Sequence, residues 1–521
     1  MPSTTLDDIL SRPFGTLSAL IRLHARRGPH RLAMQQGQRR VDYATLDAMM
    51  DRVAASLVRD GVRPGEAIAI CAGSSMEYVA VFLGALRAGV AVAPLAPSST
   101  PDSLATMIAD ARAGILFLDA QVAKALAPVD GRIAARKIAL DASAADLSLE
   151  DWLVAGGTPP VETRILPDYP FNIIYSSGTT GTPKGIVQPH SMRWVQWQRA
   201  GSYGYTPEAI TLVSTPLYSN TTLVSLLPTL ALGGCCVLMP TFNALGFLAL
   251  AQEHRVTHAM LVPVQYQRIM ALPEFGSYDL SSFRAKFCTS SPFSAALKAD
   301  VVKRWPGTLI EYYGMTEGGG TCVLEAHRYP DKLHTVGLPA PGHDLRVIDE
   351  QGRELPRGEA GEIVGHSGSM MKGYHNQPAR SAEAEWKDAS GRRFIRTGDI
   401  GRFDEDGFLI LMDRRKDMII TGGFNVYPSD LEVVLRTHPE VADAAVVGVP
   451  SDRWGETPVA FVIRKPGATV VPEALKEWAN KRLGKTQRLA SVEWTETLPR
   501  NAIGKVLKRE LRDAWKAKLS A

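Results

Sequence analysis

Apolar positions in the first hundred residues follow two periods in turn. Spacings of three and four predict an amphipathic helix over residues 43–57 that ends before Gly61. Continuous apolar runs at 67–71 and 90–95 predict buried strands, and the segment 76–86 between them has a helical pattern. Strand, helix and strand in this order form a βαβ unit, so we expect the two strands to be parallel.

The same alternation continues along the first four hundred residues. Short apolar runs alternate with helix-length segments, and we expect strands at 115–118, 173–175, 211–214 and 260–264. The sequence has neither a solenoid period nor long linkers rich in Pro, Gly or Ser. We therefore predict one large α/β domain whose mostly parallel sheets are packed with helices.

A change of pattern occurs at the charged cluster 413–417, which lies between apolar strands at 408–412 and 418–420. We place a domain boundary there, with a large N-terminal domain over 1–413 and a small α+β domain over 414–521. In the small domain we expect helices at 429–436 and 472–483 and strands at 444–449 and 459–463.

The composition is that of a globular protein, because 45% of the 521 residues are apolar and 21% are charged. The 58 Lys and Arg residues exceed the 54 Asp and Glu residues by only four, and no block of like charges gathers this excess. We therefore expect no nucleic-acid partner, and any partner must be inferred from individual sites.

Cysteines and the N-terminus indicate where the protein works. Five cysteines without paired CxxC spacings indicate buried free thiols rather than a zinc site or disulfides. Residues 1–12 lack a continuous apolar core, and no later run reaches about 18 apolar residues. We expect a cytoplasmic protein without an integral membrane segment.

The most informative segment, residues 175–185, reads Tyr-Ser-Ser-Gly-Thr-Thr-Gly-Thr-Pro-Lys-Gly directly after an apolar strand. Glycines let the backbone close around an anion, hydroxyl and N–H groups donate to phosphate oxygens, and Lys184 supplies a positive charge. The segment differs from a Walker loop, since proline precedes and glycine follows the lysine. A short Gly/Ser/Thr cluster alone would also suit a flexible surface loop.

The whole segment resembles the hallmark loop of the adenylate-forming superfamily, which includes acyl-CoA synthetases, aryl-CoA ligases, firefly-type luciferases and the adenylation domains of peptide synthetases. In that family the loop holds the β- and γ-phosphates of ATP. The resemblance assigns this role to Ser176, Ser177, Gly178, Thr179, Thr180, Gly181 and Lys184.

Residues 312–317 match the Tyr-Gly-x-Thr-Glu segment of the same family. The resemblance implies that Tyr313 stacks on adenine, that Thr316 contacts the α-phosphate and that Glu317 binds Mg²⁺. The residue types suit these roles, because a carboxylate beside a hydroxyl can ligate a hard cation that neutralises phosphates. Thr316, Glu317 and Lys184 are therefore candidate catalytic residues.

Two further segments resemble the ribose-binding part of the family. In residues 396–399, Asp399 takes the place of the aspartate that accepts hydrogen bonds from both ribose hydroxyls, and an ionised acceptor suits a vicinal diol. Arg414 stands where the family has a ribose-contacting arginine, and Lys416 stands at its hinge position. Arg415 is expected to lie in a solvated turn.

The C-terminal motifs concern coenzyme A and catalysis. Residues 422–428 resemble the loop that lines the tunnel for the pantetheine arm of CoA, which makes Gly422 and Gly423 candidate CoA-binding residues. Trp454 either flanks the CoA nucleotide or closes the core of the small domain. Lys505 matches the catalytic lysine, a mobile cation that neutralises charge as the acyl-adenylate forms.

The acid pocket departs from the family pattern. The resemblance assigns Tyr218, Asn220, Ser290, Gly314 and Gly319 to its wall. Ser219 replaces a histidine that many relatives have, and no aspartate stands nearby to pair with an ammonium group, so we expect an acid without an α-amino group. The triple glycine 318–320 is expected to leave open room, which favours a fatty acid over an aromatic one. The turn 288–293 is bulkier and more polar than the family's glycine-rich turn.

Together the motifs predict an AMP-forming acyl-CoA synthetase with Mg²⁺ as cofactor and with ATP, CoA and a carboxylic acid as substrates. The segment 484–487 departs from the family's sequence beside the CoA nucleotide, so the resemblance leaves the binding of the adenosine end of CoA open. Alternatives are a ligase that loads a carrier protein, a luciferase-like oxygenase and a non-catalytic nucleotide-binding protein. The sequence leaves open whether the chain forms a homodimer.

Overall fold

The structure is a computed structural model, and it describes residues 5–141, 145–160, 162–176, 184–414, 416–421, 424–451, 453–484, 487–501 and 504–520. These residues form two compact units. The larger unit comprises Met1–Leu333, Ala340–Asp344 and Gly365–Ile395, and the smaller unit comprises His334–Pro339, Leu345–Val364 and Arg396–Ala521. Part of the predicted N-terminal domain thus packs with the C-terminal residues, and a functional boundary between residues 413 and 414 stays a prediction.

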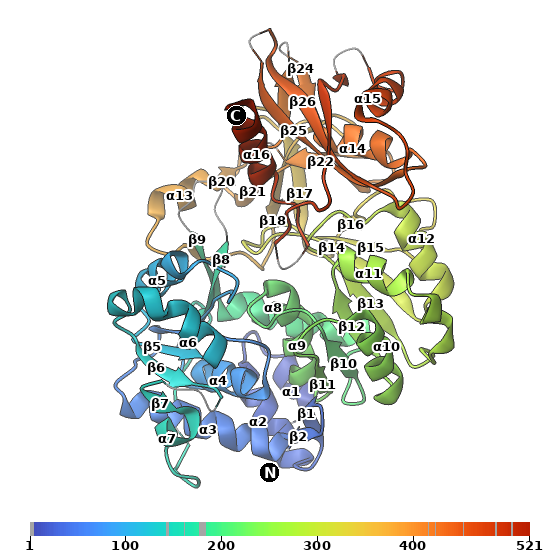
Figure 1. Cartoon of the computed structure of the whole chain (residues 1–521). Coiled ribbons are helices and arrows are strands. Elements are labelled where there is room, and N and C mark those ends of the chain that lie inside the picture. The colour runs from blue at the N-terminus through green and yellow to red at the C-terminus, as the bar shows by residue number, and fades with distance from the viewer. Residues whose placement is uncertain are drawn as a thin grey trace. The chain divides into compact units, whose positions relative to one another are not determined.

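An eight-stranded sheet of the larger unit carries the predicted phosphate-loop strand (Figure 1). Its order is β19-β9-β8-β4-β3-β5-β6-β7, and the pairs β3·β4, β3·β5 and β5·β6 are parallel, as the βαβ pattern predicts. The strands are β3 (Ala67–Cys71), β4 (Ala91–Pro94), β5 (Ile115–Leu118), β6 (Arg136–Ala139), β7 (Leu147–Ser148), β8 (Pro170–Ser176), β9 (Lys184–Pro189) and β19 (Gly373–Tyr374).

Side chains of different size cover the two faces of this sheet. Successive residues of a strand point to opposite faces. On β3, Ala67 and Ala69 pack in the core with α5 (Pro101–Asp110) and α6 (Ala120–Leu126). Ile68 and Ile70 pack on the other side, in the core that contains α3 (Tyr43–Arg59) and α4 (Met76–Arg87), which form the helical layer between the two large sheets.

The second large sheet shares that core from the opposite side. Within the larger unit its order is β15-β14-β13-β12-β10-β11-β1-β2. Its strands are β1 (Leu32–Gln36), β2 (Arg39–Asp42), β10 (Ile210–Val213), β11 (Cys235–Leu238), β12 (His258–Leu261), β13 (Ala285–Cys288), β14 (Thr308–Tyr313) and β15 (Cys322–Glu325). The other helices of the unit are α1 (Leu6–Leu10), α2 (Leu17–Arg27), α7 (Leu149–Trp152), α8 (His190–Ala200), α9 (Asn220–Ala231), α10 (Ala244–Glu253), α11 (Pro263–Met270), α12 (Ala295–Arg304) and α13 (Pro378–Glu383).

A third, smaller sheet corresponds to the small β-barrel-like part that the resemblance to the adenylate-forming superfamily also implies for the fold. Its described strands follow the order β17-β18-β21-β20, and β22 pairs with β21. They are β17 (Asp344–Ile348), β18 (Gly361–His366), β20 (Glu385–Lys387), β21 (Arg393–Phe403) and β22 (Leu409–Arg414). Strand β21 is divided between the two units: its residues up to Ile395 belong to the larger unit, and those from Arg396 belong to the smaller unit. The later residues of β21 pair with β22.

The C-terminal part of the smaller unit is an α+β sandwich, as predicted. The sheet order is β24-β23-β26-β25, and β27 pairs with β26. Helices α14 and α15 pack on one face, and α16 packs on the other. The elements are β23 (Ile419–Thr421), β24 (Phe424–Val426), α14 (Pro428–Arg436), β25 (Val441–Ser451), β26 (Gly455–Arg464), α15 (Pro472–Asn480), β27 (Ser491–Trp494) and α16 (Lys508–Ser520).

One predicted strand, 260–264, is wrong in its second half. Strand β12 ends at Leu261, and α11 begins at Pro263. Proline favours the first position of a helix, because its fixed φ suits the helix and its missing N–H would have no partner there. The apolar run therefore crosses a boundary between a strand and a helix that periodicity alone does not reveal.

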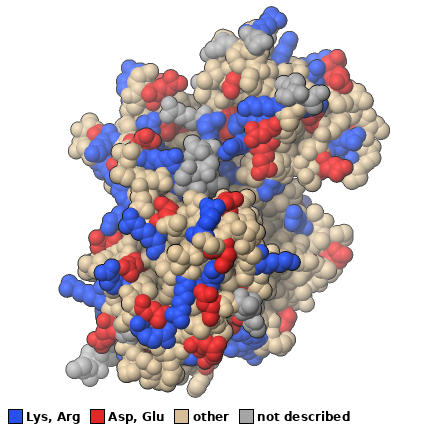
Figure 2. Space-filling model, turned by 60° about the vertical axis from the view of Figure 1, so that its left-hand side comes forward, with Lys and Arg blue, Asp and Glu red and all other residues tan. Residues whose placement is uncertain are grey.

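The cysteines, the surface charges and the helix lengths each bear on a prediction from the sequence. All five cysteines are free, and four of them are buried, as predicted. On the face shown in Figure 2, basic and acidic side chains are interspersed. No helix of the described residues is both long and apolar enough to cross a membrane.

Candidate active site

Tyr374 contacts both Lys184 and Glu317 in the larger unit. The Nζ of Lys184 lies 5.1 Å from the centroid of the Tyr374 ring, and the Tyr374 hydroxyl donates to Oε1 of Glu317 at 3.0 Å. Strand β19 brings Tyr374 there, because it pairs antiparallel with β9 and sets Tyr374 opposite Ile186. Burial and the nearby Glu317 carboxylate raise the pKa of Tyr374, so its hydroxyl remains a donor at neutral pH.

The turn that carries Glu317 is fixed by its backbone. The Glu317 carbonyl accepts a hydrogen bond from the Met371 N–H at 2.7 Å, and the Gly319 N–H donates to the Ser369 carbonyl at 2.9 Å. Gly318 also forms a β-bridge with Met370. These contacts fix the backbone of the turn, and the Tyr374 hydroxyl then holds the Glu317 carboxylate.

The open room expected beside the triple glycine is not found at Gly318 and Gly319. A Cβ on Gly318 would lie 2.0 Å from the Ser369 carbonyl oxygen, and one on Gly319 would lie 2.7 Å from the Gly365 carbonyl oxygen. Both glycines also have a positive φ, of 76° and 91°. Their missing side chains allow two backbone segments to approach closely. They therefore do not support the predicted preference for fatty acids.

Gln188 is a site residue that the sequence did not reveal. Lys184 and Gln188 stand four positions apart on β9, so their side chains share one face. The Gln188 amide donates from Nε2 to the carbonyl of Thr316 at 2.6 Å. This contact ties β9 to the Thr316–Glu317 turn, and no spacing rule connects residues that lie so far apart in the chain.

Tyr312 and Tyr313 end β14 with their side chains on opposite faces. The Tyr312 ring stacks on Phe287 at 5.8 Å and meets Tyr203 edge to face, so it belongs to an aromatic cluster. Tyr313 is buried on the other face. Because Tyr312 belongs to the aromatic cluster, Tyr313 is the residue of the two that can face adenine. Its stacking on adenine stays a prediction.

Of the residues predicted for the acid pocket, Tyr218 and Asn220 lie at the start of α9, Ser290 lies in the turn after β13, and Gly314 and Gly319 follow β14. Asn220 and Tyr218 are half-buried, and Gly314 is exposed. The Thr221 and Ser290 hydroxyls are 2.6 Å apart, which joins the two segments. Ser290 has a φ of 84°, a left-handed conformation that costs energy for a residue with a side chain. The Ser290 hydroxyl therefore contacts the start of α9, and the assignment of this turn to the acid pocket stays a prediction.

Asp399 and Arg414 meet in the smaller unit. They stand opposite each other on β21 and β22, and the Arg414 Nε lies 3.0 Å from Oδ1 of Asp399. The Thr397 hydroxyl accepts a hydrogen bond from the Asp399 N–H at 3.0 Å and donates to the Ile363 carbonyl at 2.8 Å. The two residues predicted to contact ribose are therefore brought together and held on a rigid strand pair.

Lys505 lies near the same pair. Burial, together with the positive charges of Arg414 and Lys416, lowers the pKa of Lys505 to about 8, although Asp399 and Asp417 oppose the shift. Burial also lowers the pKa of Lys416. Lys505, Lys416 and the pair predicted to contact ribose thus form one charged cluster within the smaller unit.

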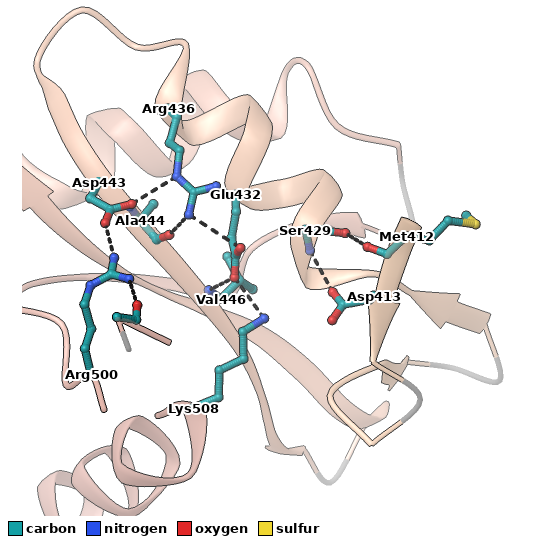
Figure 3. Close-up of polar contacts among 11 residues, drawn as sticks. Met412, Asp413, Ser429, Glu432, Arg436, Asp443, Ala444, Val446, Arg500 and Lys508 are labelled. Carbon is teal, nitrogen blue, oxygen red and sulfur yellow. Dashed lines mark hydrogen bonds and ion pairs between the residues drawn. The ribbon is translucent and has the colours of Figure 1, made fainter. Parts of the chain in front are cut away.

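A network of ion pairs supports the segment that carries Lys505 (Figure 3). Arg500 donates from Nη1 to the Gly504 carbonyl at 2.6 Å and from Nη2 to Oδ2 of Asp443 at 2.5 Å. Arg436 holds the other oxygen of Asp443 at 3.0 Å, and Lys508, just beyond Lys505, pairs with Glu432 of α14 at 2.9 Å. The loop before α16 is therefore attached to the sheet and to α14 on both sides of Lys505.

The remaining predicted site residues are described in part or not at all. Ser177, Gly178, Thr179, Thr180, Gly181, Gly422 and Gly423 lie outside the described residues, as does the side chain of Ser176. Trp454 is 49% exposed, and the Arg453 guanidinium lies 4.8 Å from its ring centroid. Trp454 therefore does not close the core of the small domain, which leaves the CoA-binding alternative.

A magnesium site would depend on Glu317. Among the residues that the structure describes, no group of three or more His, Cys, Asp or Glu side chains could hold a metal ion. Mg²⁺ is commonly bound by one or two carboxylates together with substrate phosphates. A single carboxylate that accepts a hydrogen bond from Tyr374 fits that kind of shared site.

Comparison with known proteins assigns the chain to a family. The pattern of the family described as AMP-binding enzyme matches residues 21–375, and that of the AMP-binding enzyme C-terminal domain matches residues 430–505. The chain therefore belongs to the AMP-binding enzymes, the adenylate-forming superfamily that its motifs resemble. It is an enzyme of the AMP-forming ligase class.

Individual relatives extend over nearly the whole chain. Feruloyl-CoA synthase from Amycolatopsis sp is 33% identical over 491 residues, which cover 94% of this chain and 96% of that protein. Fatty acid–[acyl-carrier-protein] ligase ScoC from Streptomyces coeruleorubidus is 31% identical over 518 residues, 96% of each. ATP-bound MatB from Rhodopseudomonas palustris has a TM-score of 0.85 at 30% identity, covering 96% of this chain and 99% of that one. Relatives named for an aromatic and for a fatty acid are thus similarly close.

Proposed function

We propose that the protein is an acyl-CoA or aryl-CoA synthetase that works in two steps at one site. In the first step a carboxylate oxygen of the acid attacks the α-phosphorus of ATP, and pyrophosphate leaves. In the second step the CoA sulfur attacks the acyl carbon, AMP leaves and the thiol proton passes to solvent. The observation that carries this proposal is the cluster of Lys505 with Asp399 and Arg414, a cation beside a nucleotide-binding pair.

The larger unit would bind the triphosphate and the acid. Lys184 faces the β- and γ-phosphates, and Thr316 donates to the α-phosphate. Mg²⁺ held by Glu317 would supply a Lewis acid that neutralises phosphate charge. Tyr374 fixes the orientation of the Glu317 carboxylate that would hold Mg²⁺, because its hydroxyl donates to one of the two carboxylate oxygens.

The smaller unit would bind the ribose and supply the mobile cation. Asp399 accepts hydrogen bonds from the ribose hydroxyls, and Arg414 exchanges part of its contact with Asp399 for one with ribose. Lys505 neutralises the charge that develops between the carboxylate and the α-phosphate. For the second step a rotation about Lys416 would remove Lys505 and bring the loop with Gly422 and Gly423 to the site.

The experiment that tests this function measures pyrophosphate release across a panel of fatty, aromatic, branched and amino acids, followed by AMP release on addition of CoA. We expect pyrophosphate with an acid that lacks an α-amino group, and AMP release that depends on CoA. The fatty acid preference predicted from the sequence is decided by the same panel. A best substrate among amino acids, or no pyrophosphate with any acid, would overturn the proposal.

A second acceptor is favoured by one observation, the similarity to a ligase that acts on an acyl carrier protein. In that case the acyl group would pass to the pantetheine thiol of a carrier protein by the same chemistry. Incubation of the acyl-adenylate-loaded enzyme with free CoA and with a pantetheinylated carrier protein separates the two. AMP release with the carrier alone would favour the alternative.

A further inference from the structure

A fully buried arginine organises the polar residues beside the acid pocket. Arg193 of α8 has no exposed surface, and its Nη2 donates to Oε1 of Gln188 at 2.5 Å and to Oδ1 of Asn220 at 2.7 Å. Its Nη1 donates to Oε1 of Gln196 at 3.2 Å. All three partners are neutral amides, and within the described part of the chain no carboxylate is paired with this guanidinium.

The direction of these hydrogen bonds is fixed by chemistry. A guanidinium has donors and no acceptor, so each amide must turn its oxygen towards Arg193. For Gln188 this orientation leaves the NH2 group to donate to the Thr316 carbonyl, which can only accept. Both contacts of Gln188 therefore agree with one orientation of its amide.

The same reasoning orients Asn220. Its Oδ1 accepts from Arg193 at 2.7 Å and faces the Gln188 NH2 group at 3.4 Å, so two donors converge on that oxygen. A flipped amide would set its own NH2 group against both donors. The Asn220 NH2 group consequently points away from Arg193, and in the described residues it donates to no other group.

The protonation of Arg193 supports this orientation. Burial lowers the pKa of Arg193 to about 9, so the guanidinium keeps its charge at neutral pH. A buried charge without an opposite charge is costly unless every nearby dipole is turned towards it. The amide dipoles of Gln188 and Asn220 are turned in this way, which makes their orientation strongly preferred.

Asn220 also stands where the acid is expected to bind. It is half-buried at the first position of α9, and Gln188 links it to the Thr316 backbone through two hydrogen bonds. The neighbouring Thr221 and Ser290 hydroxyls are in contact at 2.6 Å, so this part of the wall is polar. A purely hydrocarbon substituent would cover these polar groups without replacing their hydrogen bonds to water.

We propose that Arg193 orients Asn220 so that its NH2 group donates to an oxygen of the substrate that lies away from the reacting carboxylate. The substrate class is then a carboxylic acid with an additional carbonyl, ether, phenolic or carboxylate oxygen. This inference rests on the proposed function, because it needs the acid to bind beside Thr316. In this role Asn220 is a specificity-determining residue and Arg193 is a positioning residue.

The test compares matched pairs of acids by pyrophosphate release. Suitable pairs are cinnamic with 4-methoxycinnamic acid, and octanoic with 7-oxooctanoic acid. We expect the purified wild-type protein to have a kcat/KM about tenfold higher for the oxygenated member of at least one pair, as one added hydrogen bond allows. Asn220→Leu should reduce this ratio towards one.

Two further variants test the orientation of the Asn220 side-chain amide. Asn220→Asp keeps the shape but replaces the NH2 group by a carboxylate oxygen, so we expect the ratio to fall below one. Arg193→Met removes the donor that fixes the amide, and the ratio should fall while thermal unfolding reports whether the protein stays folded. Gln196→Leu is the matched control, because Gln196 contacts Arg193 but not Asn220, and its ratio should equal that of the wild type.

The outcomes separate this inference from the proposed function. If no acid released pyrophosphate, the proposed function itself would fail. If the wild type released pyrophosphate equally from both members of every pair, or if Asn220→Asp kept the wild-type ratio, the substrate class inferred here would be wrong and the ligase function would stand.

Discussion

Asp399 and Arg414 face each other across β21 and β22, and the Nε of Arg414 lies 3.0 Å from Oδ1 of Asp399. Both residues were predicted to contact ribose, yet here they contact each other. Asp399 is almost fully buried, whereas Arg414 is partly exposed. The pair therefore sets a carboxylate acceptor beside a guanidinium donor, an arrangement that suits hydrogen bonds with a diol.

Replacing Asp399 by asparagine should raise the ATP concentration needed for half-maximal pyrophosphate release. Loss of a charged acceptor costs about 1.5 to 3 kcal/mol, equivalent to roughly ten- to hundredfold in the KM for ATP. Glu405→Gln, in an exposed turn of the same unit, serves as the control and should leave that KM unchanged. An unchanged KM in Asp399→Asn would exclude the ribose contact.

Removing the Lys505 side chain should separate the two half-reactions. We expect Lys505→Ala to slow acyl-adenylate formation by about 10²- to 10³-fold, as removal of one preorganised charged group does. Thioester formation from synthetic acyl-adenylate should be nearly intact. Gly423→Leu should have the reverse effect, because a side chain in the thiol tunnel would obstruct pantetheine. Equal loss of both half-reactions in both variants would mean that a single arrangement of the units does all the chemistry.

The pH dependence of stability should also report on Lys505. Its pKa of about 8 lies below the usual lysine value of 10.5, so the folded protein releases this proton before the unfolded chain does. Between these two pH values the unfolded state binds more protons, and the free energy of unfolding should rise with pH. Urea denaturation at several pH values should show this rise in the wild type and a smaller one in Lys505→Gln. An identical pH profile in both proteins would argue against the buried position.

Two substitutions of Tyr374 test its ring and its hydroxyl separately. Tyr374→Phe keeps the ring beneath Lys184 but removes the hydrogen bond to Glu317, so we expect turnover at limiting Mg²⁺ to fall about tenfold. Tyr374→Leu should reduce turnover further, because the cation–π contact is lost as well. Mg²⁺ titrations of pyrophosphate release measure both effects. Glu317→Gln should lower turnover at limiting Mg²⁺ more than either Tyr374 variant does. If Tyr374→Phe were as active as the wild type, the Tyr374 hydroxyl would have no role in the site.

Arg500 tests how the Lys505 segment is held. Arg500→Met removes the contacts to Gly504 and Asp443, and we expect acyl-adenylate formation to fall about tenfold while the second half-reaction persists. Lys518→Met, which breaks the ion pair between Lys518 of α16 and Glu493 of β27, is the matched control and should affect neither step. A loss of both half-reactions with an unchanged melting temperature would contradict a role limited to Lys505.

The fold was largely predictable, because its signals are local. The helix at residues 43–57 and the strand at 67–71 appear as α3 and β3, since spacing and apolar runs report which face of an element is buried. The prediction failed where a local pattern was ambiguous, as in the apolar run that ends β12 and starts α11 at Pro263. The meaning of Gly318 and Gly319 was also misjudged, because a missing side chain looks the same in sequence whether it admits a ligand or a neighbouring backbone.

The sequence alone determined the class of enzyme, because ordered motifs such as 312–317 and the segment ending at Lys505 are contiguous. Only the tertiary structure joined Tyr374 to Glu317, which are 57 residues apart, and Gln188 to Thr316, which are 128 apart. Arg193 gave no sequence signal, since an arginine in a helix is ordinarily solvated. Its burial against Asn220 follows from how α8 and α9 pack, and packing depends on contacts between residues distant in the chain, which periodicity and motifs do not encode.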